Sequence, residues 1–158
     1  MVSARARTGR PEHARLSGET LQFMQRLWDL VHALDVRSKR MARTLGVTGP
    51  QRLVIRVLGR SPGSTASDVA GTLGLHPSTL TGILKRLEDQ GMLERRGDTE
   101  DRRRVRFRLT AKGLEVDRAR KGTVEAAVRR ALGRAGDATA EQTMRMLELL
   151  TSELAREE

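Results

Sequence analysis

The sequence predicts a mainly α protein (α+β) that contains one two-stranded β-hairpin. Apolar residues recur at steps of three and four over most of the 158 residues, which is the period of amphipathic helices. The exception is the segment over residues 93–110, whose return strand (residues 104–109) alternates with the period of two that is typical of a strand. Glycine and proline separate these segments, so the expected order is four helices, the hairpin and two more helices.

The N-terminal part of the chain is expected to form an arm and two helices. Residues 1–16 are basic and have no apolar periodicity. Apolar positions then keep helical spacing over residues 18–45, and Gly46 stands where a helix commonly ends. Thr48 begins a second helix that ends near Gly59. The inward positions of the second helix are expected to be Leu53, Val54, Val57 and Leu58.

Two more helices form a helix-turn-helix pattern. A short helix over residues 65–73 precedes a tight turn at Gly74, and Pro77 opens a longer helix that ends near Gln90. His76 stands where serine or aspartate would cap that helix better, so it either caps the helix weakly or contacts a phosphate. The apolar stripe of the longer helix spans about 100° and should face the core. Its members are Leu80, Ile83, Leu84 and Leu87.

The opposite face of the helix over residues 77–90 is suited to the major groove of DNA. It is small and polar near its start and cationic one turn later. A helix that enters the groove by its first turns needs close approach, hydroxyl groups and then cations. An ordinary solvated face is the alternative. The residues expected to contact DNA are Ser78, Thr79, Thr81, Gly82, Lys85 and Arg86.

The hairpin over residues 93–110 has one apolar and one cationic face. Arginines alternate with apolar residues over residues 104–109, so the ribbon can pack on a small domain and lie along a phosphate backbone. Asp101 stands two residues before Arg103 and is expected to orient that guanidinium towards a groove. An edge hairpin that blocks aggregation, or a salt bridge that only stiffens the turn, are the alternatives. The hairpin residues expected to contact DNA are Arg102, Arg103, Arg104 and Arg106.

Two helices are expected after the hairpin. Apolar positions keep helical spacing over residues 111–133 despite two glycines, which predicts one long helix. Residues 133–138 should form a loop. A capping box over Thr139–Gln142 then opens the last helix, which is expected to end near residue 156.

Composition favours a nucleic-acid partner and excludes several kinds of site. The formal net charge is +10 and the pI is about 11.4, with arginine the main cation, although a GC-rich genome would also enrich arginine. The lack of cysteine excludes thiol redox sensing, disulfides and cysteine-ligated zinc. Three scattered histidines lack metal-ligand spacing. Two phenylalanines and one tryptophan are too few to stack on single strands.

Three stretches around the hairpin carry a specific pattern. Residues 70–81 lead through a turn into a helix, residues 84–93 end that helix and enter the hairpin, and residues 98–113 form an Asp- and Arg-rich tip and return. Together these stretches resemble the MarR (multiple antibiotic resistance regulator) family of bacterial transcription factors. The resemblance implies a winged helix-turn-helix and a homodimer whose terminal helices intertwine.

The resemblance also implies a division of the chain and roles for its residues. An arm (1–16) and a first dimerisation helix (17–47) would precede the DNA-binding domain (48–110), with C-terminal dimerisation helices after it (111–158). Arg103, oriented by Asp101, would enter the minor groove. Two recognition helices would read a pseudo-palindromic operator in double-stranded DNA.

Family members also differ in the signals that they sense. Those that sense peroxide use a cysteine near the start of the first helix, and this chain has none. Many relatives bind small aromatic acids between the dimer core and the DNA-binding lobe. Trp28, His32 and Arg56 could hold such a phenolic effector, but a packed Trp28 with the other two at the surface is the alternative, so they are not assigned as a site.

The sequence therefore predicts a dimeric, sequence-specific regulator, a repressor of the MarR type that a small molecule releases. The alternatives are an architectural or nucleoid protein that binds DNA without sequence preference, and an enzyme. We expect no catalytic, cofactor or metal site. No apolar run approaches the roughly 18 residues of a membrane span, so we expect a cytoplasmic, nucleoid-associated protein.

Overall fold

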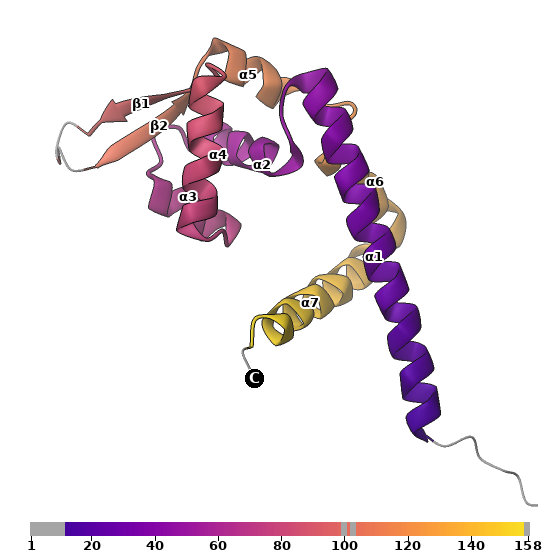
Figure 1. The fold of residues 1–158 in the computed structure, drawn as a ribbon. Coiled ribbons are helices and arrows are strands. Elements are labelled where there is room, and N and C mark those ends of the chain that lie inside the picture. Colours follow the sequence, from indigo (N-terminus) through magenta and orange to yellow (C-terminus); the bar gives the residue numbers. More distant parts are fainter. Residues whose placement is uncertain (1–11, 99–100, 102–103, 157–158) are drawn as a thin grey trace, which may run out of the picture. The chain divides into compact units, whose positions relative to one another are not determined.

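The computed structural model describes residues 12–98, 101 and 104–156. This part of the chain forms helices and one two-stranded antiparallel sheet (Figure 1). The elements are α1 (Glu12–Leu45), α2 (Gly49–Arg60), α3 (Ala66–Leu73), α4 (Pro77–Asp89), β1 (Leu93–Gly97), β2 (Val105–Leu109), α5 (Ala111–Arg118), α6 (Val124–Ala135) and α7 (Asp137–Leu154).

The chain divides into two compact units, residues 1–36 and residues 37–158. The described part of the first unit is the larger portion of α1, which begins at Glu12 and not at the expected Gly18. Its large apolar side chains are exposed, and Trp28 is 62% exposed. Trp28 therefore does not pack in a core of the single chain. The second unit holds the end of α1 and all the other elements.

Threonine side chains begin α2 and α3. The N–H of Thr48 donates to the Gln51 side chain at 2.8 Å, and the N–H of Gln51 donates back to Thr48 Oγ1 at 3.4 Å. Thr65 and Asp68 form the same reciprocal capping box at the start of α3. Gly74, with φ of +62°, then makes the expected tight turn into α4.

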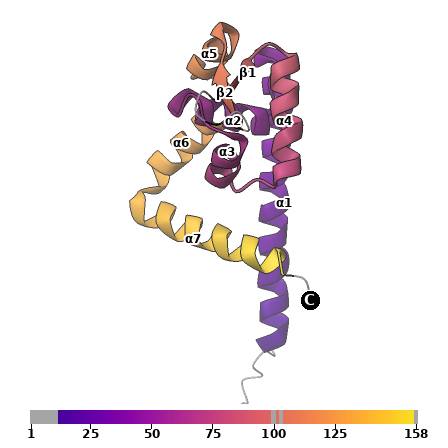
Figure 2. The same ribbon diagram turned by 90° about the vertical axis from the view of Figure 1, so that its left-hand side faces the viewer.

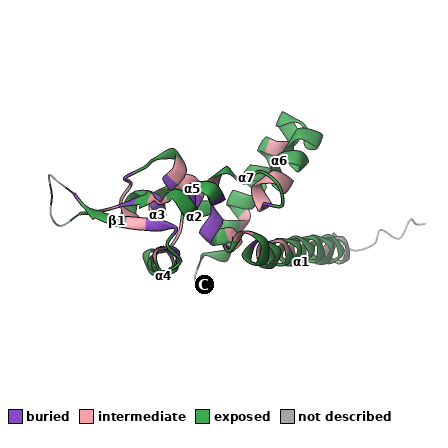
Figure 3. Ribbon diagram, turned by 90° about the horizontal axis from the view of Figure 1, so that it is seen from above, coloured by how far each residue is buried: buried purple, intermediate pink, exposed green. Residues whose placement is uncertain are grey.

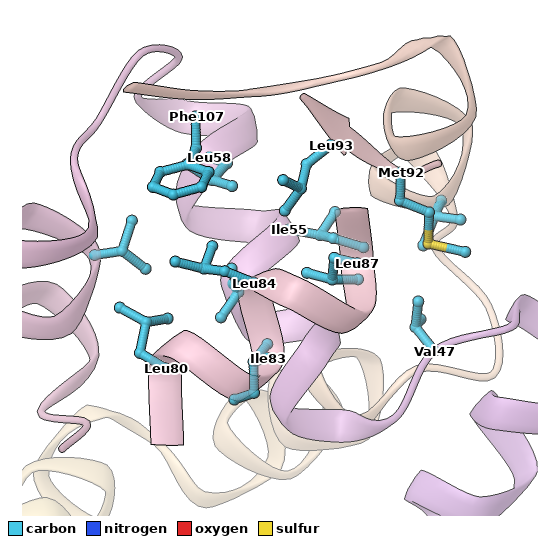
Figure 4. Close-up of a cluster of buried hydrophobic side chains, with 13 residues drawn as sticks. Val47, Ile55, Leu58, Leu80, Ile83, Leu84, Leu87, Met92, Leu93 and Phe107 are labelled. Atoms are coloured by element: carbon cyan, nitrogen blue, oxygen red, sulfur yellow. The ribbon is translucent and has the colours of Figure 1, made fainter. Parts of the chain in front are cut away.

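One hydrophobic core lies among α2, α3, α4 and the hairpin (Figure 4). The four residues that the sequence placed on the inward stripe of α4 are all buried, which confirms that prediction. In α2 the prediction was partly wrong, because Leu53 is 49% exposed and Ile55 is buried instead. The buried positions of α2 follow helical spacing from Gln51, and that spacing turns Leu53 outward.

The hairpin has the two faces that the alternation predicted. Leu93 pairs with Leu109 and Arg95 with Phe107, so these side chains share one face of the antiparallel ribbon. Phe107 is buried on that face, where the ribbon packs on the core. The other face carries Glu94, three arginines and no apolar side chain within the two strands.

The loop before α3 extends the hairpin on its open edge. The N–H of Gly63 donates to the carbonyl of Phe107 at 2.9 Å, and the N–H of Phe107 donates to the carbonyl of Ser64 at 3.0 Å. Thr65 and Arg106 form an isolated bridge beside these bonds. Strand β2 is therefore held on both sides, by β1 and by the loop before α3. These contacts fix the direction of the hairpin relative to α3, and we call the hairpin over residues 93–109 the wing.

Residues 111–133 span two helices, α5 and α6, so the prediction of one long helix over this range is wrong. The described part of the chain thus has three helices after the hairpin rather than two. Helix α5 ends at Arg118, and Gly122 turns the chain with φ of +75°. Thr123 then begins α6, because its Oγ1 accepts from the N–H of Ala126 at 3.2 Å.

The junction between the last two helices also differs from the prediction. Helix α6 continues to Ala135, and Gly136 alone, with φ of +80°, turns the chain into α7 (Figure 2). The expected loop over residues 133–138 is therefore wrong. Helix α7 begins at Asp137 with no side-chain cap, so the capping box at Thr139 is wrong as well.

Helices α6 and α7 bury none of their residues within the single chain (Figure 3). Their apolar side chains instead face outward at helical spacing. The exposed large members are Val128, Leu132, Met144, Met146, Leu147, Leu149 and Leu154. Among the helices of the described residues, none has the length and apolar character needed to cross a bilayer.

Candidate nucleic-acid interface

The outward face of α4 carries all six of the helix residues that the sequence predicted to contact DNA, and each is exposed. Thr81 Oγ1 donates to the carbonyl of Pro77 at 2.9 Å, and Lys85 Nζ lies 3.0 Å from Asp89 Oδ2. A Cβ built on Gly82 would meet no heavy atom within 4 Å. The helix surface at Gly82 is thus open to close approach by a partner.

A histidine caps the start of α4. The Nδ1 atom of His76 accepts from the backbone N–H of Ser78 at 3.3 Å and lies 2.8 Å from Ser78 Oγ. Pro77 follows at the first helical position, where its missing N–H leaves no donor unpaired. The bond to the backbone is long, so His76 is the weak cap that the sequence suggested.

Arg106 connects the tip end of the hairpin to the loop before α3. Its Nε and Nη2 atoms both lie 2.7 Å from Asp98 Oδ2, and its Nη1 donates to the carbonyl of Gly63 at 3.1 Å. Asp98 is buried beneath this contact. The guanidinium that the sequence assigned to DNA is therefore engaged within the protein, while Arg108 on the same face is exposed.

Backbone hydrogen bonds connect the described residues of the wing tip, which are Asp98, Asp101 and Arg104. The N–H of Arg104 donates to the carbonyl of Asp101 at 2.9 Å, and the N–H of Asp98 donates to the carbonyl of Arg104 at 3.0 Å. Arg104 Nε also lies 3.6 Å from Asp101 Oδ2. Arg102 and Arg103 lie outside the described residues, so the role of Arg103 and its orientation by Asp101 stay predictions.

A groove of about 500 Å³ lies between α4, which is the recognition helix of the helix-turn-helix, and the wing. Thr81 of α4, Arg95 and Arg104 of the hairpin segment and residues 65–68 at the start of α3 line it. Hydrogen bonds from the backbone and side chain of Thr65 hold the pKa of Asp68 below its ordinary value, and nearby arginines add to the effect. The polar face of α4 and the cations of the wing thus meet at one surface.

A buried arginine connects this domain to the C-terminal helices. Arg52 of α2 is 1% exposed and donates to the backbone carbonyls of Val116, Asp117 and Ala119 at the end of α5. Its Nε and Nη2 atoms lie 2.7 Å and 2.6 Å from Glu125 Oε1 of α6. One side chain therefore holds α2, the end of α5 and the start of α6 together.

The charge of Glu125 reflects that contact. Partial burial acts to raise the pKa of Glu125, but the hydrogen bond and charge of Arg52 and the local backbone outweigh it. The pKa of Glu125 consequently lies below its ordinary value. Among the described residues, no group of three or more His, Asp or Glu side chains could hold a metal ion.

Comparison with known proteins assigns this domain to a family. A sequence model of the MarR family matches residues 45–104, from the end of α1 to the return of the wing. An HTH-type transcriptional repressor of Mycobacterium tuberculosis is 31% identical over 109 residues, which are 69% of this chain and 78% of that protein. This chain belongs to the MarR family. As a member of the MarR family, it is a DNA-binding regulator of transcription.

Solved structures of similar fold agree with this assignment. The structure of a MepR-like protein with pseudoligands matches this MarR-family chain with a TM-score of 0.68 at 26% identity, over 84% of this chain and 94% of that one. Reduced AbfR bound to DNA matches with a TM-score of 0.64 at 25% identity, over 92% and 98%. The Staphylococcus aureus MepR–DNA complex, at 20% identity and a TM-score of 0.68 over 85% and 97%, shares the fold.

Sequence reasoning missed two features of this MarR-family interface. The closure of Arg106 on Asp98 was missed because the period of two places a side chain on a face but says nothing of its partner. The clamp formed by Arg52 had a signal, since an arginine on the inward side of an amphipathic helix needs buried partners. Its partners lie more than 60 residues away, as the separations of 64 and 73 residues show, and no local pattern identifies them.

Proposed function

We propose that this chain is a homodimeric, sequence-specific repressor that binds a pseudo-palindromic operator in double-stranded DNA and leaves it when a small ligand binds. One observation carries the proposal: Thr81 of the recognition helix and Arg104 of the wing line the same groove. In a duplex, α4 would lie in the major groove while Arg103, oriented by Asp101, would enter the adjacent minor groove. The AbfR and MepR structures named above, which are of similar fold, contain DNA.

The exposed apolar faces support the homodimer. Helix α1 exposes large apolar residues at helical spacing, among them Leu21, Met24 and Trp28, and α6 and α7 bury nothing in the single chain. Exposed apolar patches of that size are typical of protein interfaces. Light scattering on the purified protein should give twice the mass of one chain. A monomer at micromolar concentration would contradict the homodimer.

Sequence preference is tested by titration. A duplex recovered from a randomised library with the purified protein should bind about 10³-fold or more tightly than a scrambled duplex of the same composition. Equal affinities at physiological salt would instead indicate an architectural protein that binds without sequence preference.

The wing assignment is tested by one substitution. Arg103→Ala should weaken operator binding by about 1–3 kcal/mol while the dimer stays intact. Arg118→Ala, which removes an exposed arginine from α5, is the matched control and should leave the affinity nearly unchanged. If Arg103→Ala binds as tightly as the wild type, the minor-groove assignment is wrong.

A second cavity supports release by a small acid. About 490 Å³ of space lies among α2, α3 and α6, and apolar residues such as Leu53 and Leu73 line it. The charged groups of its lining are the arginines Arg56, Arg60 and Arg129 and the carboxylates of Asp68 and Glu125, so the arginines are in excess. An apolar surface beside guanidinium groups suits an aromatic carboxylate. Benzoate and 4-hydroxybenzoate should displace the protein from its operator, and uncharged benzamide should not. No displacement by either acid, or equal displacement by benzamide, would contradict this assignment.

A further inference from the structure

His76 and Ser78 form a hydrogen-bonded pair at the first turn of the recognition helix. Nδ1 of His76 lies 2.8 Å from Ser78 Oγ and accepts from the Ser78 N–H at 3.3 Å. An N–H donor can bond only to an unprotonated ring nitrogen, so the capped state requires neutral imidazole with its proton on Nε2. In this state the Ser78 O–H donates to Nδ1, and Oγ presents only lone pairs to a partner.

Protonation of the imidazole reverses the direction of this bond. With a proton on Nδ1, the ring becomes the donor and Ser78 Oγ becomes its acceptor. The Ser78 hydroxyl hydrogen is then free to point outward, so Oγ can donate to a partner. The same two side chains thus present opposite hydrogen-bond polarity to DNA in the two charge states of the ring.

We propose that His76 sets the hydrogen-bond polarity of Ser78 and that this polarity decides which base the recognition helix prefers. The inference rests on the proposed function, in which the first turn of α4 lies against base edges. A hydroxyl that only accepts suits cytosine, which presents an amino donor, and a hydroxyl that donates suits guanine and thymine, which present acceptors. Adenine presents one group of each kind and is not discriminated. His76 is therefore a positioning residue for specificity, because it acts through Ser78.

The charged groups near His76 and Ser78 are mostly paired with one another, so the group expected to change the polarity of Ser78 is His76. On α3 the acidic side chain is Asp68, which is bonded to Thr65 at the far end of that helix. On α4, Lys85 pairs with Asp89, and Arg86 lies in the last turns. Strand β1, which packs against α4, contributes Arg95, paired with Glu88 of α4, and the pair of Arg96 with Glu94.

Helix α2, which packs against both α3 and α4, contributes three arginines. Arg52 and Arg56 contact α5, and Arg60 lies at the end of α2. Arginine keeps its charge across the pH range in which histidine changes charge, about pH 5 to 8. A change of readout within that range that is lost in His76→Asn therefore reports on His76.

The experiment is a selection of binding sites at two pH values. The purified full-length protein selects duplexes from a randomised library at about pH 6 and about pH 8. One base position in each half-site should change its preference, with guanine or thymine favoured at low pH and cytosine at high pH. A single hydrogen bond predicts a change of about three- to tenfold in relative affinity.

Two variants and one control separate this effect from a structural one. In His76→Asn the side chain can still accept from the Ser78 N–H but has no proton to gain, so its preference should be the same at both pH values. Ser78→Ala should also lose the pH dependence. His32→Gln, at an exposed histidine on α1, should keep it.

The possible outcomes are distinct. If no sequence is enriched at either pH, the proposed function fails. If the wild type enriches one sequence with the same base preferences at both pH values, only the role of His76 is overturned. A pH-dependent preference that persists in His76→Asn or Ser78→Ala also overturns it.

Discussion

Arg106 and Asp98 face each other at the tip end of the two strands, with the Nε and Nη2 atoms of the arginine each 2.7 Å from Oδ2 of the aspartate. The same guanidinium donates to the carbonyl of Gly63 in the loop before α3. The Asp98 side chain is only 5% exposed, and this contact is one of those that offset the cost of burying its carboxylate. The pair therefore fixes the wing to the helix-turn-helix.

Asp98→Asn should weaken the contact between Asp98 and Arg106 that holds the wing. The substitution keeps the size of the side chain but removes the charge that pairs with Arg106, and we expect the free energy of unfolding to fall by about 1–3 kcal/mol. Urea denaturation measures the change. Asp29→Asn breaks the exposed pair with Arg26 and should change stability by less than about 0.5 kcal/mol. If the two substitutions lower the free energy of unfolding equally, the Asp98 contact contributes no more to stability than an exposed ion pair.

Arg52→Met should destabilise the fold more strongly. It removes one donor from each of three carbonyls at the end of α5, which keep other donors. It also leaves the Glu125 carboxylate without the Arg52 guanidinium, and we expect a total cost of about 3 kcal/mol. Thermal and urea unfolding should both report the loss. The double variant with Glu125→Gln should be less destabilised than the sum of the single variants, by about 1 kcal/mol. Strict additivity would contradict a direct coupling between the two side chains.

Gly82→Ala should separate stability from DNA binding. No heavy atom within 4 Å opposes the new methyl group in the free protein, and alanine in a helix is favoured over glycine by about 0.5–1 kcal/mol. The variant should thus unfold at higher urea concentration yet bind its operator less tightly, because the methyl group prevents close approach. Gly71→Ala in α3, where space is also open, is the control and should gain stability without losing affinity.

Stability should fall in acid partly because of Glu125. The pKa of this carboxyl is lower in the folded chain than its ordinary value, mainly because Arg52 outweighs the effect of burial. Its contribution is therefore complete above the unfolded pKa of about 4.3 and is lost as the pH falls through the folded pKa. Urea midpoints measured from neutral pH to about pH 3 should fall less steeply for Glu125→Gln than for the wild type. Parallel curves would assign the acid sensitivity to other groups.

The sequence predicted those elements whose partners are local. The inward stripe of α4 follows from the spacing of Leu80, Ile83, Leu84 and Leu87, and the capping threonine of α2 stands beside the residue it bonds. The break after α5 was not predictable in this way. Arg52 of a distant helix binds the carbonyls at the end of α5, and only then does Gly122 act as a turn and not as a tolerated helix residue.

In the candidate site too, the features set by local periodicity were predicted and those set by tertiary contacts were not. The outward face of α4 follows from helical period alone, and the structure places its six residues at the surface. The strand period placed Arg106 on the polar face of the wing, but the buried Asp98 that engages it belongs to a different strand end. Which of several arginines pairs with a given carboxylate depends on their distance in the folded chain. The alternation of residues along a strand does not predict that distance.

In the proposed homodimer, the lack of any fully buried residue in α6 and α7 would link the lifetime of the protein to its abundance. Helices with so little burial in their own chain gain little to offset the entropy of ordering them, and the surface of the second chain would supply the rest. Under mass action, dilute chains then spend more time with these helices open to proteases, and concentrated chains are protected. Turnover of the regulator would consequently slow as its gene dosage rises, and two alleles with compatible C-terminal helices would protect each other's products.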